Sequence, residues 1–257
     1  MSEQQLRPTQ TPLNELAATY VRAGETLFLA ILDDIAARVR LAHPEAEYLE
    51  VSLYPTDEVE LHGIWSTTTP GQGSHRLLWA RAGATEDWRD GPLDLGELVQ
   101  DLGRILPHSF LHRWGVIQPD PRIEYRNRRR WLALPSADRT AAIAETVRRH
   151  VPDAESLICR FETDHGGIAV GFEQVTLTSG ATISIPCPHC SPDSEDGPWP
   201  HEITYQLAQL LGQLYALPHL RARHLTPCVD LESEHEGQLW QLVFPYREPT
   251  LVGATHH

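Results

Sequence analysis

The chain has 257 residues, and 41% of them are hydrophobic, enough to bury the core of one or two domains. Its formal net charge of −14 argues against binding nucleic acid or an anionic membrane through the overall field. No apolar run reaches the length of about 18 residues that a membrane helix needs, and residues 1–13 are too polar for a secretory signal. We therefore expect a cytoplasmic protein that does not contact a membrane.

Apolar spacing predicts a helix, three strands and a second helix in the first part of the chain. The first helix should end before His43 and Pro44, because a residue that precedes proline is pushed out of the α region. The strands are rich in β-forming residues that alternate with polar ones. These elements are a helix over 27–39, strands over 48–54, 59–65 and 77–80, and a helix over 95–105.

The same succession of elements is predicted again in the second part of the chain. The second set begins with a helix and ends with a strand that is too short and too aromatic for a lone helix. Its elements are a helix over 137–150, strands over 157–161, 167–175 and 181–185, a helix over 201–217, and a last strand over 238–244.

Residues of the two parts also match one by one, at a separation near 108 positions. Collinear matches in several separate blocks are the signature of an internal repeat. In the longest blocks, Ile35, Ala36, Val39, Arg40, Pro44, Ala46, Glu47, Leu49 and Gly63 fall on Ile143, Ala144, Val147, Arg148, Pro152, Ala154, Glu155, Leu157 and Gly171. The pattern predicts a tandem duplication of one α-β-β-β-α unit.

The predicted fold class is therefore α+β, because helices that bracket a run of adjacent strands favour antiparallel sheets with the helices packed on one face. Three regions follow from the repeat. We expect a first α+β repeat over 14–115, an arginine-rich linker over 116–134, and a second α+β repeat with its C-terminal strand over 135–257.

The linker holds the only basic patch of the chain. Arginines with interleaved aromatic rings can grip phosphate groups or stack on bases, which would suit a nucleotide or oligonucleotide. At a net charge of −14, the favoured alternative is that they pair with the chain's own carboxylates, so nucleic acid is an unlikely partner. The residues concerned are Arg126, Arg128, Arg129, Arg130 and Trp131.

Several enzyme classes are excluded by what the sequence lacks. It contains no lysine, so phosphate-binding loops with a lysine, Schiff-base chemistry and serine–lysine pairs are ruled out. Codon bias toward arginine or selection against lysine modification would both explain this absence. The glycine-rich dinucleotide motif, the serine nucleophile elbow and the zinc-protease motif are also missing.

All four cysteines lie in the second part of the chain, where they suggest a metal site. Cys187 and Cys190 are two residues apart in a loop, and His224 with Cys228 would place a nitrogen and a sulfur within one helical turn. Together these four residues predict a tetrahedral zinc site. His201, His219 and Cys159 are alternative ligands, and reduced cysteines without any metal remain the simpler interpretation.

The sequence Cys187-Pro188-His189-Cys190 also resembles the active-site tetrapeptide of the thioredoxin superfamily, over these four residues only. That resemblance implies disulfide oxidoreductase chemistry, which needs a thiol with a low pKa at a helix N-terminus. Here an acidic loop follows over 191–198, and negative charge raises the pKa of a thiol. The surroundings therefore disagree with the resemblance.

We expect a non-catalytic adaptor or regulatory protein that binds a protein partner, because the catalytic motifs are missing and the surface is acidic. Trp88 and Trp199, flanked by aspartate and proline in loops, are candidate anchors for that partner. Two alternatives stay open at this point: a zinc-containing enzyme or zinc-stabilised regulator, and a nucleotide or oligonucleotide binder that uses Arg126 to Trp131. The oligomeric state is not predicted.

Overall fold

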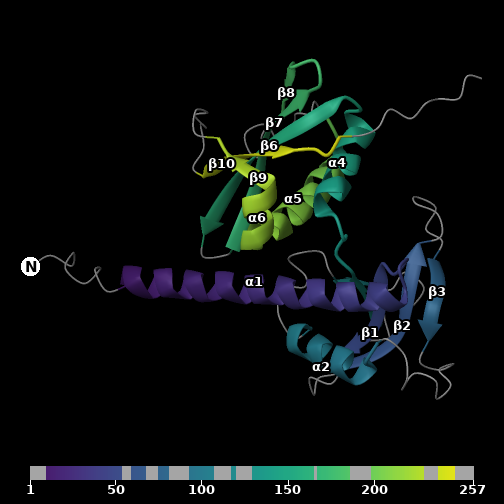
Figure 1. The fold of residues 1–257 in the computed structure, drawn as a ribbon. Coiled ribbons are helices and arrows are strands. Elements are labelled where there is room, and N and C mark those ends of the chain that lie inside the picture. Colours follow the sequence, from purple (N-terminus) through teal and green to yellow (C-terminus); the bar gives the residue numbers. More distant parts are fainter. Residues whose placement is uncertain are drawn as a thin grey trace, which may run out of the picture.

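Two five-stranded antiparallel sheets and five helices make up the part of the chain that the structure describes (Figure 1). The structure is a computed structural model. The described residues are 10–53, 59–67, 75–80, 93–106, 117–119, 129–164, 167–185, 198–228 and 237–246. The predicted α+β class is confirmed. No helix in these ranges is both long and apolar enough to cross a membrane.

The first sheet has the strand order β3-β2-β1-β5-β4. Its unit begins with a long helix and places a second helix between the third and fourth strands. The bounds are α1 (Gln10–Ala42), β1 (Tyr48–Leu53), β2 (Val59–Thr67), β3 (His75–Ala80), α2 (Leu95–Ile105), β4 (Ile117–Pro119) and β5 (Arg129–Ala133).

The region 116–134, expected to be a linker, instead contributes β4 and β5 to the first sheet. β5 lies beside β1, where Leu49 is opposite Leu132 and Glu50 is opposite Trp131. Two arginines at the start of this short strand hid its apolar alternation from the sequence pattern. Within the described residues, the first unit therefore has the succession α-β-β-β-α-β-β, with two strands more than predicted.

The second sheet has the strand order β8-β7-β6-β10-β9. If the strands of each sheet are numbered one to five along the chain, both sheets have the order 3-2-1-5-4. The predicted last strand is confirmed as β10, beside β6. A short helix and a three-residue strand before it had no sequence signal. The bounds are α4 (Arg139–His150), β6 (Ala154–Asp164), β7 (Gly167–Leu177), β8 (Thr182–Ser184), α5 (His201–Ala216), α6 (Pro218–His224), β9 (Leu225–Pro227) and β10 (Gln238–Val243).

The same two hydrogen bonds from an arginine brace each unit. Arg40, near the end of α1, donates from Nε to the carbonyl of Ala46 over 3.2 Å and from Nη1 to the carbonyl of Pro135 over 2.6 Å. Arg148, in α4, donates in the same way to the carbonyls of Ala154 and Pro245, each over 2.9 Å. Each arginine thus joins the end of a helix to the start of one strand and the end of another.

The buried apolar positions repeat as well. One continuous core cluster contains residues of both units. Matching buried residues are Ile35 and Ile143, Ala36 and Ala144, Val39 and Val147, Leu49 and Leu157, Leu98 and Leu207, and Leu102 and Leu211. Leucine, isoleucine and valine at helical spacing in α1 and α4, together with alternation in β1 and β6, account for this packing.

Helix α1 has 33 residues and starts well before the expected position at Leu27. Its N-terminal half leaves the first sheet and runs along the second unit (Figure 1). There Thr26 donates from Oγ1 to the carbonyl of Ala216 over 3.0 Å. Arg139, at the start of α4, donates to both carboxylate oxygens of Asp33 over 2.5 and 3.1 Å, so a partly buried ion pair also joins the units.

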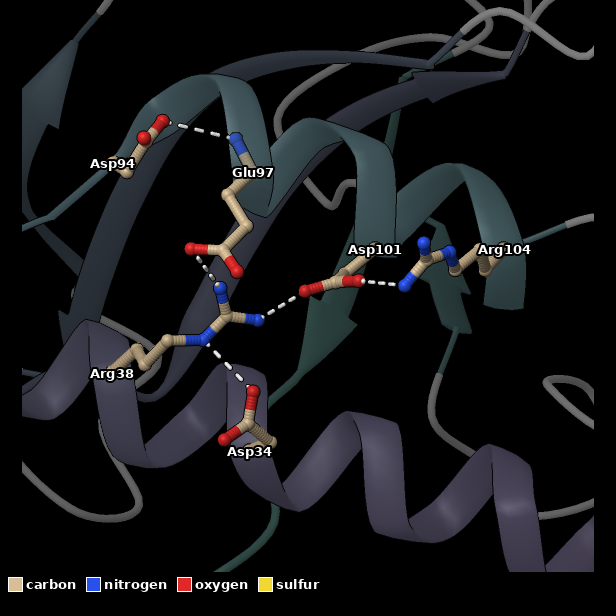
Figure 2. A network of polar contacts seen from close by, with 6 residues as sticks. All are labelled: Asp34, Arg38, Asp94, Glu97, Asp101 and Arg104. Carbon is tan, nitrogen blue, oxygen red and sulfur yellow. Dashed lines mark hydrogen bonds and ion pairs between the residues drawn. The ribbon is translucent and has the colours of Figure 1, made fainter.

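Figure 2 shows the polar network that fixes α2 to α1. Asp94 caps α2 by accepting from the backbone N–H of Glu97 over 3.0 Å. Arg38 of α1 contacts Asp34 over 2.9 Å, Glu97 over 3.5 Å and Asp101, which also accepts from Arg104 over 2.8 Å. Burial alone lowers the pKa of Arg38, but these carboxylates outweigh it and raise the pKa, so the side chain stays charged.

Candidate functional site on the outer faces of the two sheets

Each sheet has one face in the core and one face directed away from it, which we call the outer face. In β1, Leu49 and Val51 belong to the core cluster, so the alternate residues Tyr48, Glu50 and Ser52 lie on the outer face. Trp131 lies directly opposite Glu50 and is buried, yet it is outside the core cluster. The outer face of the first sheet therefore carries its own buried residues.

Four aromatic side chains, one each from β1, β2, β3 and β5, form a cluster on this face. We call it the aromatic cluster, and its members are Tyr48, Trp65, His75 and Trp131. Trp131 is its centre and only 2% exposed. The ring of Trp131 stacks on Trp65 with centroids 5.7 Å apart, and the edge of His75 meets it at 4.3 Å. Tyr48 contacts both Trp131, at 5.0 Å, and His75, at 5.7 Å. Because the rings pack against one another, the cluster is a solid platform.

A buried carboxylate beside the platform holds an arginine. Glu50 accepts from Nε1 of Trp65 over 3.0 Å and from Nη1 of Arg129 over 2.7 Å. Gly63, opposite Glu50, leaves room for this arrangement, since a Cβ there would lie 2.7 Å from Nε1 of Trp65. The Arg129 side chain is 41% exposed, so a fixed guanidinium stands at the edge of the aromatic cluster in contact with solvent.

A β-bulge adds a serine–histidine pair to the same face. His62 is the extra residue of β2, between the pairs Glu50–Gly63 and Val51–Leu61. A bulge redirects a side chain, and here Nε2 of His62 lies 2.7 Å from Oγ of Ser52. The carboxylate of Glu60 lies 3.8 Å from the same Nε2. A catalytic triad has its carboxylate on the other ring nitrogen, so Glu60 does not take the place of the triad's acid.

The second sheet has a bulge at the matching place, with different chemistry. Glu173 is the extra residue of β7, between the pairs Ile158–Gln174 and Cys159–Phe172. It accepts from Nη1 of Arg160 over 2.7 Å, and Glu162 accepts from Nε of the same arginine over 2.8 Å. In the second sheet, the bulge residue and the side chain it contacts thus belong to an ion-pair cluster. In the first sheet, the corresponding two residues form a serine–histidine pair.

The glycine match Gly63–Gly171, made from the sequence, does not hold in this register. Gly63 follows the bulge residue directly and pairs with Glu50. Gly171 lies on the other side of its bulge and pairs with Arg160, where a Cβ would come within 2.9 Å of Nη2. Both glycines make room for a side chain of the neighbouring strand, but at different positions.

The structure separates the expected partner-binding residues into three groups. Arg129, Arg130 and Trp131 are brought together in β5, with Trp131 buried instead of available as an anchor. Trp199 is also buried, with Nε1 3.1 Å from Oγ1 of Thr204 and its ring against Phe172, so it belongs to the core. Trp88, Arg126 and Arg128 lie outside the described residues.

The proposed zinc ligands are not joined by a helical turn. α6 ends at His224, and Cys228 follows only after β9, so about 13 Å of extended chain separates the two. Cys187 and Cys190 lie outside the described residues, and within the described ranges no group of three metal-ligating side chains gathers. The side chain of His201 is not described, and His219 is exposed.

Cys159, the remaining candidate ligand, is fully buried in β6 and contacts the carbonyl of Trp240 over 3.6 Å. Burial raises the pKa of its thiol, and Cys228 and Glu173 add to this effect. Burial also raises the pKa of Cys228.

Glu50, Ser52, His62, Trp65 and Tyr48 were missed as site residues by sequence reasoning. The alternation of β1 places Tyr48, Glu50 and Ser52 on one face, but only the register of β1 with β2 brings them together with His62 and Trp65. No family model matches this sequence, and neither a curated protein nor a solved structure matches the chain.

Proposed function

We propose that the chain is a non-catalytic protein-binding module built from two copies of one α+β unit, with the helices of each copy on one face of its sheet. The shared strand order, the matching braces from Arg40 and Arg148 and the two bulges at matching places support a duplication. Independent origins would have to reproduce each of these features separately.

The observation that carries the proposed function is the surface beside the aromatic cluster. It joins the solvent-exposed guanidinium of Arg129, held by Glu50, to Leu77 of β3, which is 44% exposed and lies opposite Trp65. Arginine, aromatic and exposed aliphatic groups on a rigid support are the composition of protein–protein hot spots. A guanidinium fixed in advance also loses less conformational entropy when a partner binds.

The outer face of the second sheet suits this role less well. Its arginine, Arg160, is buried and engaged by Glu162 and Glu173, so its charge is neutralised within the sheet. Val243 is exposed there, but it lies opposite the small, buried Ser156. We therefore assign partner binding to the first sheet.

A paired capture experiment tests this assignment. The full chain, immobilised through a terminal tag, is incubated with lysate, and the captured proteins are compared for wild type, Leu77→Asp, Arg129→Ala and the matched control Val243→Asp. We expect both first-sheet variants to lose a set of proteins that the control keeps. Capture that is unchanged in the first-sheet variants, or lost only with Val243→Asp, would contradict the assignment.

A further inference from the structure

Helix α6 is cationic, in a chain whose formal net charge is −14. Its seven residues include Arg221, Arg223 and two histidines, and no aspartate or glutamate. The whole stretch 203–229, which also holds most of α5 and all of β9, contains no acidic residue, although 35 of the 257 residues of the chain are acidic. Positive charge is therefore concentrated around α6.

The two arginines of α6 keep their charge toward solvent. Arg223 is exposed and Arg221 is half-buried, and neither forms an ion pair with a carboxylate of the described residues. Exposed arginines elsewhere in the described chain do have such a partner: Arg76 pairs with Glu45, Arg104 with Asp101, and Arg149 with Glu145. The surface of α6 therefore differs from the neutralised surfaces around those three arginines.

Arg221 is also held in a fixed orientation. Its guanidinium lies over the ring of Tyr215, 4.9 Å from the centroid. Tyr215 is buried and stacks on Phe161 with centroids 4.1 Å apart, so the ring that supports the guanidinium is itself fixed. Stacking uses the face of a guanidinium and leaves the N–H donors in its plane available. Arg221 thus presents an oriented set of donors beside α6.

Helix α1 adds a third arginine beside this surface. The hydroxyl of Thr26 lies 3.0 Å from the carbonyl oxygen of Arg22 and 3.0 Å from that of Ala216, so Arg22 lies close to the end of α5, where α6 begins. Figure 1 shows α6 on the side of the second unit that faces α1. We call Arg22, Arg221 and Arg223 the arginine patch. Even if the buried Glu25 of α1 is counted against these three, a charge of about +2 remains.

We propose that the arginine patch binds an acidic segment of a protein partner, at a second site that does not depend on the first sheet. Guanidinium groups recognise carboxylates through charge-assisted, often bidentate hydrogen bonds. Helix α6 is about 10 Å long, so an extended segment of roughly three or four residues spans it. Such a segment needs to contact only the patch, and beyond a Debye length of about 8 Å the negative charge of the chain is screened.

Carboxylates fit the arginine patch better than a nucleic acid does. Binding of single strands relies on aromatic rings on which bases stack. The ring of Tyr215 is already covered by Arg221 and is buried, so it offers no face to a base. A long polyanion would also reach past the patch and meet the field of a chain with a net charge of −14.

Fluorescence anisotropy with a labelled decaglutamate peptide and the full chain at low salt tests the proposal. Decaglutamate should bind, and its dissociation constant should rise about fivefold or more in the double variant Arg221→Gln/Arg223→Gln, because two ion pairs are lost. Arg22→Gln should have a smaller effect in the same direction. The matched control Arg149→Gln removes the same charge from an exposed position of the second unit and should change the affinity little.

Two further measurements keep the test decisive. If the double variant loses its helical circular dichroism, Arg223→Gln alone replaces it, because this side chain is exposed and its loss does not disturb packing. Leu77→Asp and Arg129→Ala, which change the first sheet, should leave decaglutamate binding intact. The two binding sites can therefore fail independently of each other.

Labelled decaglutamine and decathymidylate distinguish the chemistry of the ligand. Decaglutamine should not bind, decathymidylate should bind more weakly than decaglutamate, and decaglutamate binding should weaken as salt is added. Three results would overturn the proposal: no binding of decaglutamate at low salt, equal affinity of wild type and the arginine variants, or tighter binding of decathymidylate that these variants lose. The last result would assign the patch to nucleic acid instead.

Discussion

The two sheets share a frame and differ on the outer face. In both, an arginine braces the helix to two strands, and in both the second strand carries a one-residue bulge beside the central strand. The bulge residue contacts Ser52 in the first sheet and Arg160 in the second. The first outer face is aromatic with an exposed guanidinium, whereas the second is a closed ion-pair cluster.

This difference shows which positions the fold constrains. The braces and the core leucines fix the strand order, so matching residues are needed in both units. On the outer face, the bulge residue and its partner need only to satisfy each other's hydrogen-bonding groups. Either a neutral hydrogen bond or an ion pair does so. Function can therefore differ between the units at these outer positions without a change in the frame.

The largest effects are expected at matching core positions. Leu49→Ala and Leu157→Ala each remove a fully buried side chain from the central strand, which costs about 2–5 kcal/mol of the free energy of unfolding. If the two units share one frame, the two losses should be similar in urea unfolding. A near-neutral result at either position would break the comparison.

Removing the braces should have the next largest effect. Arg40→Ala and Arg148→Ala each lose two charge-assisted hydrogen bonds to backbone carbonyls, for a cost of about 1–3 kcal/mol. Arg149→Ala is the neighbouring control, because its exposed pair with Glu145 contributes at most about 0.5 kcal/mol. The brace has no role if Arg148→Ala costs no more than this control in thermal and urea unfolding.

The outer-face pairs should differ from each other. Arg160→Met keeps the aliphatic stem but leaves Glu162 and Glu173 without a counter-charge. Both carboxylates are partly exposed, so solvent limits the cost to about 1–2 kcal/mol. Ser52→Ala removes one neutral hydrogen bond and should cost about 1 kcal/mol or less. Urea unfolding of both variants tests this order, and a larger loss for Ser52→Ala would contradict it.

The smallest expected effect is on the pH dependence of stability, through His43, a position where the two units carry different residues. Burial lowers the pKa of His43, at the turn after α1, whereas the matching residue of the second unit is Val151. The unfolded state then binds more protons than the folded state, so stability falls as pH drops below about 6.5, the pKa of an unfolded histidine. Melting curves from pH 8 to 5 should show a smaller decline for His43→Gln than for wild type. Equal declines would show that His43 contributes nothing to the pH dependence.

Much of the frame was predictable from the sequence because its signals are long and periodic. The end of α1, the strands β1, β2 and β10, and the helices α2, α4 and α5 follow apolar spacing and turn residues. The three-residue strands β4 and β9 are too short to show a period. The first half of α1 was missed because its large apolar residues Leu16 and Tyr20 are exposed and do not continue the packed face that defined the helical pattern.

The candidate site was predictable only in part. The arginines and Trp131 were noticed as a basic and aromatic patch, but the sequence placed them in a linker. Their position depends on β5 pairing with β1, and the contact of His62 with Ser52 depends on a bulge. Both are properties of strand register, which non-local pairing sets and local composition does not reveal.

Hydrogen exchange of the full chain, with and without a captured partner, tests most directly whether the first sheet is the binding surface. The account predicts that partner binding slows amide exchange in β1, β3 and β5, with little change in β6 and β10. Protection confined to the second sheet, or equal in both sheets, would contradict it.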